Sequence, residues 1–172
     1  GKMAIMSEQL EAITQHKDEG NALYQQQEFA QAIKAYTAGT RLLPDLEEDE
    51  AGHVPPSAEL RKLAAIVLCN RAASFMHEKK AVAALADAQR AADFDATNWK
   101  AHWRTGLALM MMEPRLERSE KAVAAFSRTL ECDSLPALER ENARQALSRA
   151  QYRLREGRDA LDMPDMAACS VS

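Results

Sequence analysis

An internal repeat restricts the fold of this chain more than any other feature. Three stretches, over 17–44, 70–96 and 100–134, each carry small and apolar residues in two halves separated by a short polar break. Apolar residues that recur every three or four positions indicate amphipathic helices. Each stretch is therefore predicted to form an antiparallel helix pair, and stacked pairs bury a continuous core that one pair alone cannot.

The composition predicts an all-α fold. Alanine is abundant, and Leu, Glu, Arg, Gln and Met dominate the remaining residues of the 172-residue chain. These residues lose little side-chain freedom in a helix, whereas β-branched residues are sparse and never alternate over the length of a strand. Small residues at Gly20, Ala72 and Gly106 stand where two helices would cross closely.

The repeat resembles the tetratricopeptide repeat, a unit of about 34 residues. The resemblance covers residues 10 to 134, with repeats at about 13–44, 65–96 and 99–134. It implies a right-handed superhelix of three helix pairs followed by a C-terminal capping helix. The first and second repeats stand farther apart than one period, and the excess follows Pro44.

The resemblance also gives expected boundaries. We expect a repeat domain that is interrupted by an acidic loop and ends in a capping helix, with Ser134 and Pro136 at the start of that helix and Gly157 after it. The expected segments are an N-terminal extension or vector remnant over 1–9, the domain over 10–157, the loop over about 45–60, the capping helix over about 136–156 and a flexible tail over 158–172.

Polar residues are expected on the concave surface of the stack, which the inner helices near 10–25, 60–78 and 98–111 would line. Lys17 and Asn21 are four residues apart on the first inner helix, so they share a face. The third inner helix carries Lys100 and Arg104 at the same spacing, and the second carries Asn70. Each residue taken alone is also explained as a solvated cation or a packing amide.

Together these five residues are similar to the two-carboxylate clamp of chaperone-binding tetratricopeptide domains. In that subfamily a Lys and an Asn, a second Asn, and a Lys and an Arg grip a C-terminal Asp, and all five positions match here. The resemblance implies that the ligand is the Glu-Glu-Val-Asp terminus of Hsp90 or Hsp70 chaperones. The residue types suit this ligand, because cations give charge-assisted hydrogen bonds to carboxylates and amides add donors.

Secondary contacts are predicted one turn beyond Asn70. Ala73 and Met76 would form an apolar shelf for the ligand's Val, although Met76 equally suits ordinary core packing. His77 stands where the subfamily often has a Lys, and it would donate a hydrogen bond more strongly when protonated.

Other functions lack a sequence signal. The net charge of −4 comes without a long Lys/Arg block, no run of eighteen apolar residues exists, and the three cysteines form no Cys-x-x-Cys pair. These features predict a monomeric cytoplasmic protein that binds neither nucleic acid nor membrane. Phosphate-loop, nucleophile and metal-ligand motifs are missing, so we expect no enzyme activity, metal or cofactor.

Two alternatives to the co-chaperone or adaptor function remain at this point. One is a general scaffold whose groove binds a different peptide. The other is the docking domain of a larger immunophilin-like or phosphatase-like enzyme, since such proteins carry similar modules.

Overall fold

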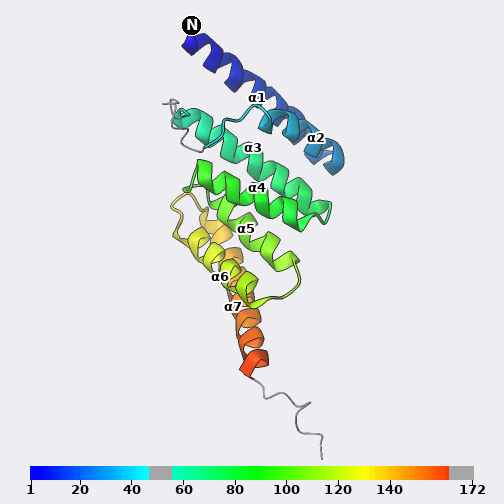
Figure 1. Ribbon diagram of the computed structural model, residues 1–172, viewed down its shortest axis with the longest axis vertical. Coiled ribbons are helices and arrows are strands. Elements are labelled where there is room, and N and C mark those ends of the chain that lie inside the picture. The colour runs from blue at the N-terminus through cyan, green and yellow to red at the C-terminus, as the bar shows by residue number, and fades with distance from the viewer. Residues whose placement is uncertain (47–55, 163–172) are drawn as a thin grey trace, which may run out of the picture.

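The computed structural model describes residues 1–46 and 56–162, and within them the chain is a ladder of helices without a strand (Figure 1). This confirms the predicted all-α class. The elements, in chain order, are α1 (Lys2–Gln25), α2 (Phe29–Thr40), α3 (Ala58–His77), α4 (Ala81–Phe94), α5 (Trp99–Met111), α6 (Leu116–Glu131), a 3₁₀ turn (Ala137–Glu139) and α7 (Arg140–Asp162).

The helices form three pairs, α1 with α2, α3 with α4, and α5 with α6, and α7 packs against α6 (Figure 1). Helices α1 and α3 also contact each other, as do α3 and α5, so these three form a continuous inner row. The predicted inner helices are therefore confirmed, and the polar residues of interest lie on them.

Local signals in the sequence explain where the helices start and turn. The Ser57 hydroxyl accepts a hydrogen bond from the Leu60 N–H at the start of α3, and the Asn98 side chain accepts one from the Lys100 N–H at the start of α5. The turns after α1 and α3 share one geometry, with Gln27 and Lys79 in the left-handed region at φ 63° and 60°. The turn between the two helices therefore has the same backbone conformation in the first and second repeats, and neither turn uses glycine at the left-handed position.

Paired helices approach closely because small residues stand at the crossings. A Cβ atom added to Gly20 would lie 2.4 Å from the ring of Tyr36, and one added to Gly106 would lie 2.5 Å from the ring of Phe126. Both rings are almost completely buried. Alanines fill much of the remaining interface with no exposed surface, among them Ala64, Ala65, Ala72, Ala84, Ala88, Ala91, Ala101 and Ala108.

A buried ion pair in the second repeat also forms hydrogen bonds to the first. The Arg71 guanidinium on α3 donates from Nε and Nη2 to the two carboxylate oxygens of Asp87 on α4, both at 2.7 Å. Its Nη1 also donates to the hydroxyls of Thr37 and Thr40 on α2, at 3.1 and 2.7 Å. One side chain thus binds three helices, and its charge is balanced where it is buried.

Two of the expected boundaries differ from the structure. The extension predicted over 1–9 belongs to α1, which begins at Lys2 because residues 3–10 contain good helix formers and no Gly or Pro. The capping helix continues past Gly157 to Asp162. The residue after Gly157, Arg158, pairs with Glu120 of α6 at 3.2 Å, and this contact helps the helix to continue past the glycine.

The start of the capping helix also differs from the predicted one. Pro136 precedes the 3₁₀ turn rather than entering an α-helix. The Ser134 hydroxyl donates to the carbonyl of Thr97 at 2.7 Å and so ties this corner to the start of the third repeat. Most of the expected acidic loop (47–55) and of the expected tail (163–172) lies outside the described residues.

We expect Gly20→Ala to destabilise the protein by about 1–3 kcal/mol, because the added methyl group forces the buried Tyr36 ring to move. Urea unfolding followed by circular dichroism measures the free energy of unfolding. Gly157→Ala is the matched control: its new Cβ meets only Leu116 at 3.8 Å, so this variant should gain about 0.5–1 kcal/mol. Equal effects at the two sites would contradict the close crossing.

Candidate functional site

A small pocket between α1, α3 and α5 contains three of the five predicted clamp residues. Its volume is about 170 Å³, and it is lined by Asn21, Tyr24, Gln25, Tyr36, Asn70, Ala73 and Arg104. The three inner helices therefore each contribute a polar group to one place. Lys17 and Lys100 are not among the lining residues, although each stands one turn from a residue that is.

Hydrogen bonds connect the two amides before any ligand is present. The Asn70 Nδ2 group donates to Asn21 Oδ1 at 3.0 Å, and the Tyr36 hydroxyl donates to the same oxygen at 2.7 Å. The Asn21 oxygen thus accepts two bonds, which occupies both of its lone pairs. The Asn21 NH₂ group remains as a pair of donors for the pocket.

The Arg104 guanidinium supplies the positive charge of the pocket. Its Nη1 atom is buried and has no hydrogen-bond partner among the described residues. A buried donor without a partner is costly, because it has lost water and gained nothing in exchange. An acceptor placed in this pocket would remove that cost.

The two flanking lysines differ from Arg104 in their contacts. Lys17 Nζ lies 3.2 Å from Asp18 Oδ1, and 22% of the Lys17 side chain is exposed. Lys100 is exposed, with its Nζ 5.8 Å from the centre of the Trp99 ring. Both chains are long and reach solvent, so they can turn toward a bound anion at a small cost in side-chain order.

Burial and nearby cations shift the pKa values of Tyr36, which lines the pocket, and of the buried Cys69 on α3. Burial raises the pKa of the Cys69 thiol, and the charges of Arg104 and Lys100 oppose this rise. Burial also raises the pKa of Tyr36 to about 12, with a further rise from Tyr24 and an opposing effect from Arg104. The Tyr36 hydroxyl therefore keeps its proton and acts as a donor at neutral pH.

The secondary residues behave differently from one another. Ala73 lines the pocket, whereas Met76 packs against the buried alanines between α3 and α4. His77 contacts two aromatic side chains: its Nε2 lies 2.9 Å from the Tyr24 hydroxyl, and its ring stacks on Phe29 with centroids 4.0 Å apart. Tyr24, Phe29 and His77 thus form an aromatic wall at the end of the inner helices.

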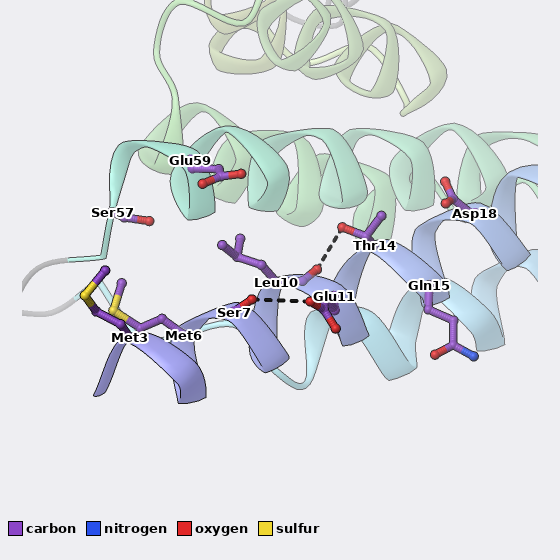
Figure 2. A pocket seen from close by; sticks show the side chains of 10 residues that line it. All are labelled: Met3, Met6, Ser7, Leu10, Glu11, Thr14, Gln15, Asp18, Ser57 and Glu59. Atoms are coloured by element: carbon purple, nitrogen blue, oxygen red, sulfur yellow. Dashed lines mark hydrogen bonds between the residues drawn. The ribbon is translucent and has the colours of Figure 1, made fainter. Parts of the chain in front are cut away.

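A second pocket, between the N-terminal half of α1 and the start of α3, is larger but of opposite charge (Figure 2). It measures about 800 Å³, and Met3, Met6 and Leu10 from α1 form its apolar part opposite Ser57 and Glu59. Its charged lining residues are all carboxylates, namely Glu11, Asp18 and Glu59. An anionic ligand is repelled there and attracted to the pocket at Arg104.

Sequence reasoning did not find three of the residues that line the pocket at Arg104, namely Tyr24, Gln25 and Tyr36. The spacing of Tyr36 on α2 is that of a core aromatic residue and gives no sign that its hydroxyl reaches the pocket. The hydroxyl reaches Asn21 because Gly20 lets the ring lie under α1. Tyr24 and Gln25 lie one turn beyond Asn21 on α1 and also line the pocket. Within the described residues, no group of three or more His, Cys, Asp or Glu side chains is placed to hold a metal ion.

No protein-family model matches the chain. Protein unc-45 homolog B from Xenopus tropicalis is 33% identical over 100 residues, and its counterpart from Xenopus laevis is 30% identical over the same length. The match covers 58% of this chain but only 9% of either relative, so the chain spans less than a tenth of the proteins it matches.

Solved structures confirm the fold. The tetratricopeptide domain of Arabidopsis OM64 is 26% identical and covers 84% of this chain and 98% of its own, with a TM-score of 0.62. The C-terminal repeat-containing domain of a Plasmodium falciparum protein described as an FK506-binding protein is 19% identical, covers 90% of this chain and 95% of its own, and has a TM-score of 0.71. The chain therefore has the tetratricopeptide-repeat fold.

Two further structures hold peptides. The first repeat domain of Spaghetti (RPAP3), bound to the HSP90 peptide SRMEEVD, is 22% identical, with coverage of 89% and 98% and a TM-score of 0.56. The second repeat domain of human RPAP3, bound to the HSP70 peptide SGPTIEEVD, is 23% identical, with coverage of 85% and 98% and a TM-score of 0.59. The structures that this chain resembles thus include chaperone-binding domains.

We expect one phenol of this protein to titrate at about pH 12, and the Tyr36→Phe variant to lack that step. An unfolded tyrosine titrates near pH 10, so the stability that the neutral buried phenol contributes is present below pH 10 and is lost as the pH rises toward 12. Ultraviolet titration of both proteins measures the step. A titration curve of the variant that equals the parent curve above pH 11 would contradict the burial of this hydroxyl.

Proposed function

We propose that the chain is a protein-interaction module of the co-chaperone or adaptor kind, which binds the acidic C-terminal tail of Hsp90 or Hsp70 chaperones. The clamp consists of Lys17, Asn21, Asn70, Lys100 and Arg104. The observation that carries this proposal is the buried Arg104 Nη1 donor, which has no partner in the part of the chain that the structure describes and shares a pocket with two amides.

The chemistry of a C-terminal Asp fits this arrangement. It offers two carboxylates a few bonds apart, and the pocket offers the Arg104 and Asn21 donors, while Lys100 and Lys17 each stand one helical turn from one of these residues and can turn toward the ligand. Hydrogen bonds to charged groups contribute about 1.5–3 kcal/mol each. Ordering a flexible tail offsets several kcal/mol, so a micromolar affinity, about −8 kcal/mol, is expected.

The charge pattern sets the direction of the tail. With its last residue at Arg104, an acidic tail is kept from the N-terminal half of α1 by Glu11, Asp18 and Glu59. It therefore extends toward the other end of the inner helices, where Ala73 lines the pocket, His77 joins the aromatic wall and Lys79 and Lys80 are exposed. We place the secondary contacts at Ala73, Met76 and His77 for this reason.

The comparisons support the same ligand class, because Spaghetti (RPAP3) domains of this fold hold peptides that end in Glu-Glu-Val-Asp. The proposed setting is a cytoplasmic monomer, with residues 10–157 as the domain core. No described helix is long and apolar enough to cross a membrane.

A second candidate is a docking segment of a much larger protein. The chain spans only 9% of the length of the unc-45 relatives, and one similar structure comes from a protein described as FK506-binding. In this candidate the module itself still performs no catalysis and supplies only the attachment to a chaperone. A general scaffold for another peptide is the outcome if acidic tails do not bind.

We expect a peptide that ends in Glu-Glu-Val-Asp to bind with micromolar affinity, and its C-terminally amidated form to bind at least tenfold more weakly. Lys17→Ala and Arg104→Ala should each weaken binding about 10- to 100-fold, because each removes a charge-assisted contact. Isothermal titration calorimetry measures the affinities, which should also fall as salt rises.

Lys34→Ala is the matched control, because Lys34 is exposed on α2 and outside the pocket. Circular dichroism should show the same helical content in all variants. Normal binding by either clamp variant would show that the clamp assignment is wrong, and no binding of either peptide by the parent protein would favour the general scaffold.

A further inference from the structure

At one equivalent position, the first repeat has a tyrosine where the third has a phenylalanine, so the two rings differ there only by a hydroxyl group. In both repeats an aromatic ring from the second helix lies under a glycine of the inner helix, Tyr36 under Gly20 and Phe126 under Gly106. The added-Cβ distances of 2.4 and 2.5 Å show that the two rings pack alike. Because phenylalanine fills this place in the third repeat, packing alone does not require the hydroxyl of Tyr36.

The Tyr36 hydroxyl donates to Asn21 Oδ1 at 2.7 Å, and Asn70 Nδ2 donates to the same oxygen at 3.0 Å. Two donors on one carboxamide oxygen fix the amide, since rotating it by half a turn would place its NH₂ group against the NH₂ group of Asn70. The fixed amide presents its own N–H donors to the pocket that contains the buried Arg104.

We propose that Tyr36 is a positioning residue of the groove, whose hydroxyl holds the Asn21 carboxamide in the orientation that donates to a ligand carboxylate. This inference rests on the proposed function. It assigns a role to a residue that does not touch the ligand but acts through Asn21, and it makes a buried side chain of α2 part of the recognition of the tail.

The orientation matters because a preorganised donor loses less freedom when the ligand arrives. With phenylalanine at position 36, Asn21 keeps only the bond from Asn70, and its amide gains freedom that binding must remove. Recognition of the carboxylate should therefore weaken while the fold is retained.

Tyr36→Phe tests this proposal, with Tyr152→Phe, an exposed tyrosine on α7, as the control. We expect Tyr36→Phe to weaken binding of the Glu-Glu-Val-Asp peptide about five- to tenfold, and the control to bind as the parent does. In an Asn21→Ala background, Tyr36→Phe should have no further effect, because its route to the ligand has been removed. A merely structural role would weaken binding in both backgrounds.

A second measurement does not need the peptide. In ¹⁵N-labelled free protein, the side-chain amide signals of Asn21 should be sharp and should shift in Tyr36→Phe, while the backbone signals of α5 to α7 stay in place. Urea unfolding of Tyr36→Phe should show the cooperative transition of a folded protein.

The outcomes separate this inference from the proposed function. Suppose that the parent protein binds the peptide. If Tyr36→Phe then binds as tightly as the parent, or if it weakens binding by the same factor with and without Asn21→Ala, Tyr36 is not a positioning residue and the clamp still stands. If the parent does not bind the peptide, the proposed function and this inference both fail. Unchanged Asn21 side-chain signals in Tyr36→Phe would overturn the inference at the level of the network itself.

Discussion

The distance between paired helices controls the other features of this molecule. Glycine at positions 20 and 106 lets an aromatic ring lie directly against the backbone of the inner helix, and alanines keep the neighbouring helices equally close. Close packing also extends between repeats, because a 3.0 Å bond between the short side chains of Asn21 and Asn70 requires the inner helices α1 and α3 to lie side by side. The pocket is therefore a result of core packing as much as of the polar residues that line it.

The groove also has an uneven distribution of charge. Arg104 and the two neighbouring lysines make its middle positive, whereas the N-terminal half of α1 and the first turn of α3 are lined with carboxylates. Under the proposed function, this distribution favours a tail that ends at Arg104 and leaves away from the carboxylates of the other pocket. Such a field contributes to orientation and to the rate of encounter more than to affinity.

The sequence predicted the helix pairs well, because the repeat period and the small residues at the crossings report directly on packing. It was less reliable at the ends. Gly157 was predicted to end the capping helix, but α7 continues past it with Arg158 paired to Glu120 of α6, and nothing in residues 2–9 breaks α1.

For the site, helical spacing paired Lys17 with Asn21 and Lys100 with Arg104, and the resemblance to the two-carboxylate clamp added Asn70; the structure brings Asn21, Asn70 and Arg104 to one pocket. Helical spacing could not show that Asn70 bonds to Asn21 or that Tyr36 joins them, because such contacts depend on how the helices are turned against one another. Spacing also could not show that the Lys17 ammonium group lies beside Asp18.

The contacts of Arg71 with Asp87, Thr37 and Thr40 bear on how cooperatively the first two repeats unfold. A solenoid often loses its units one at a time, since each touches only its neighbours. Here the Arg71 guanidinium, which is paired with Asp87 inside the second repeat, also donates to the Thr37 and Thr40 hydroxyls of the first, so the two repeats are joined by buried hydrogen bonds as well as by packing. Helix α5 packs against α4 and its Ala101 belongs to the same buried core as residues of α1 to α4, so the third repeat continues the stack through apolar packing. A molecule bound between Asn21 on α1 and Arg104 on α5 would contact the first and third repeats at the same time. The repeats should therefore unfold more cooperatively with the ligand bound than without it.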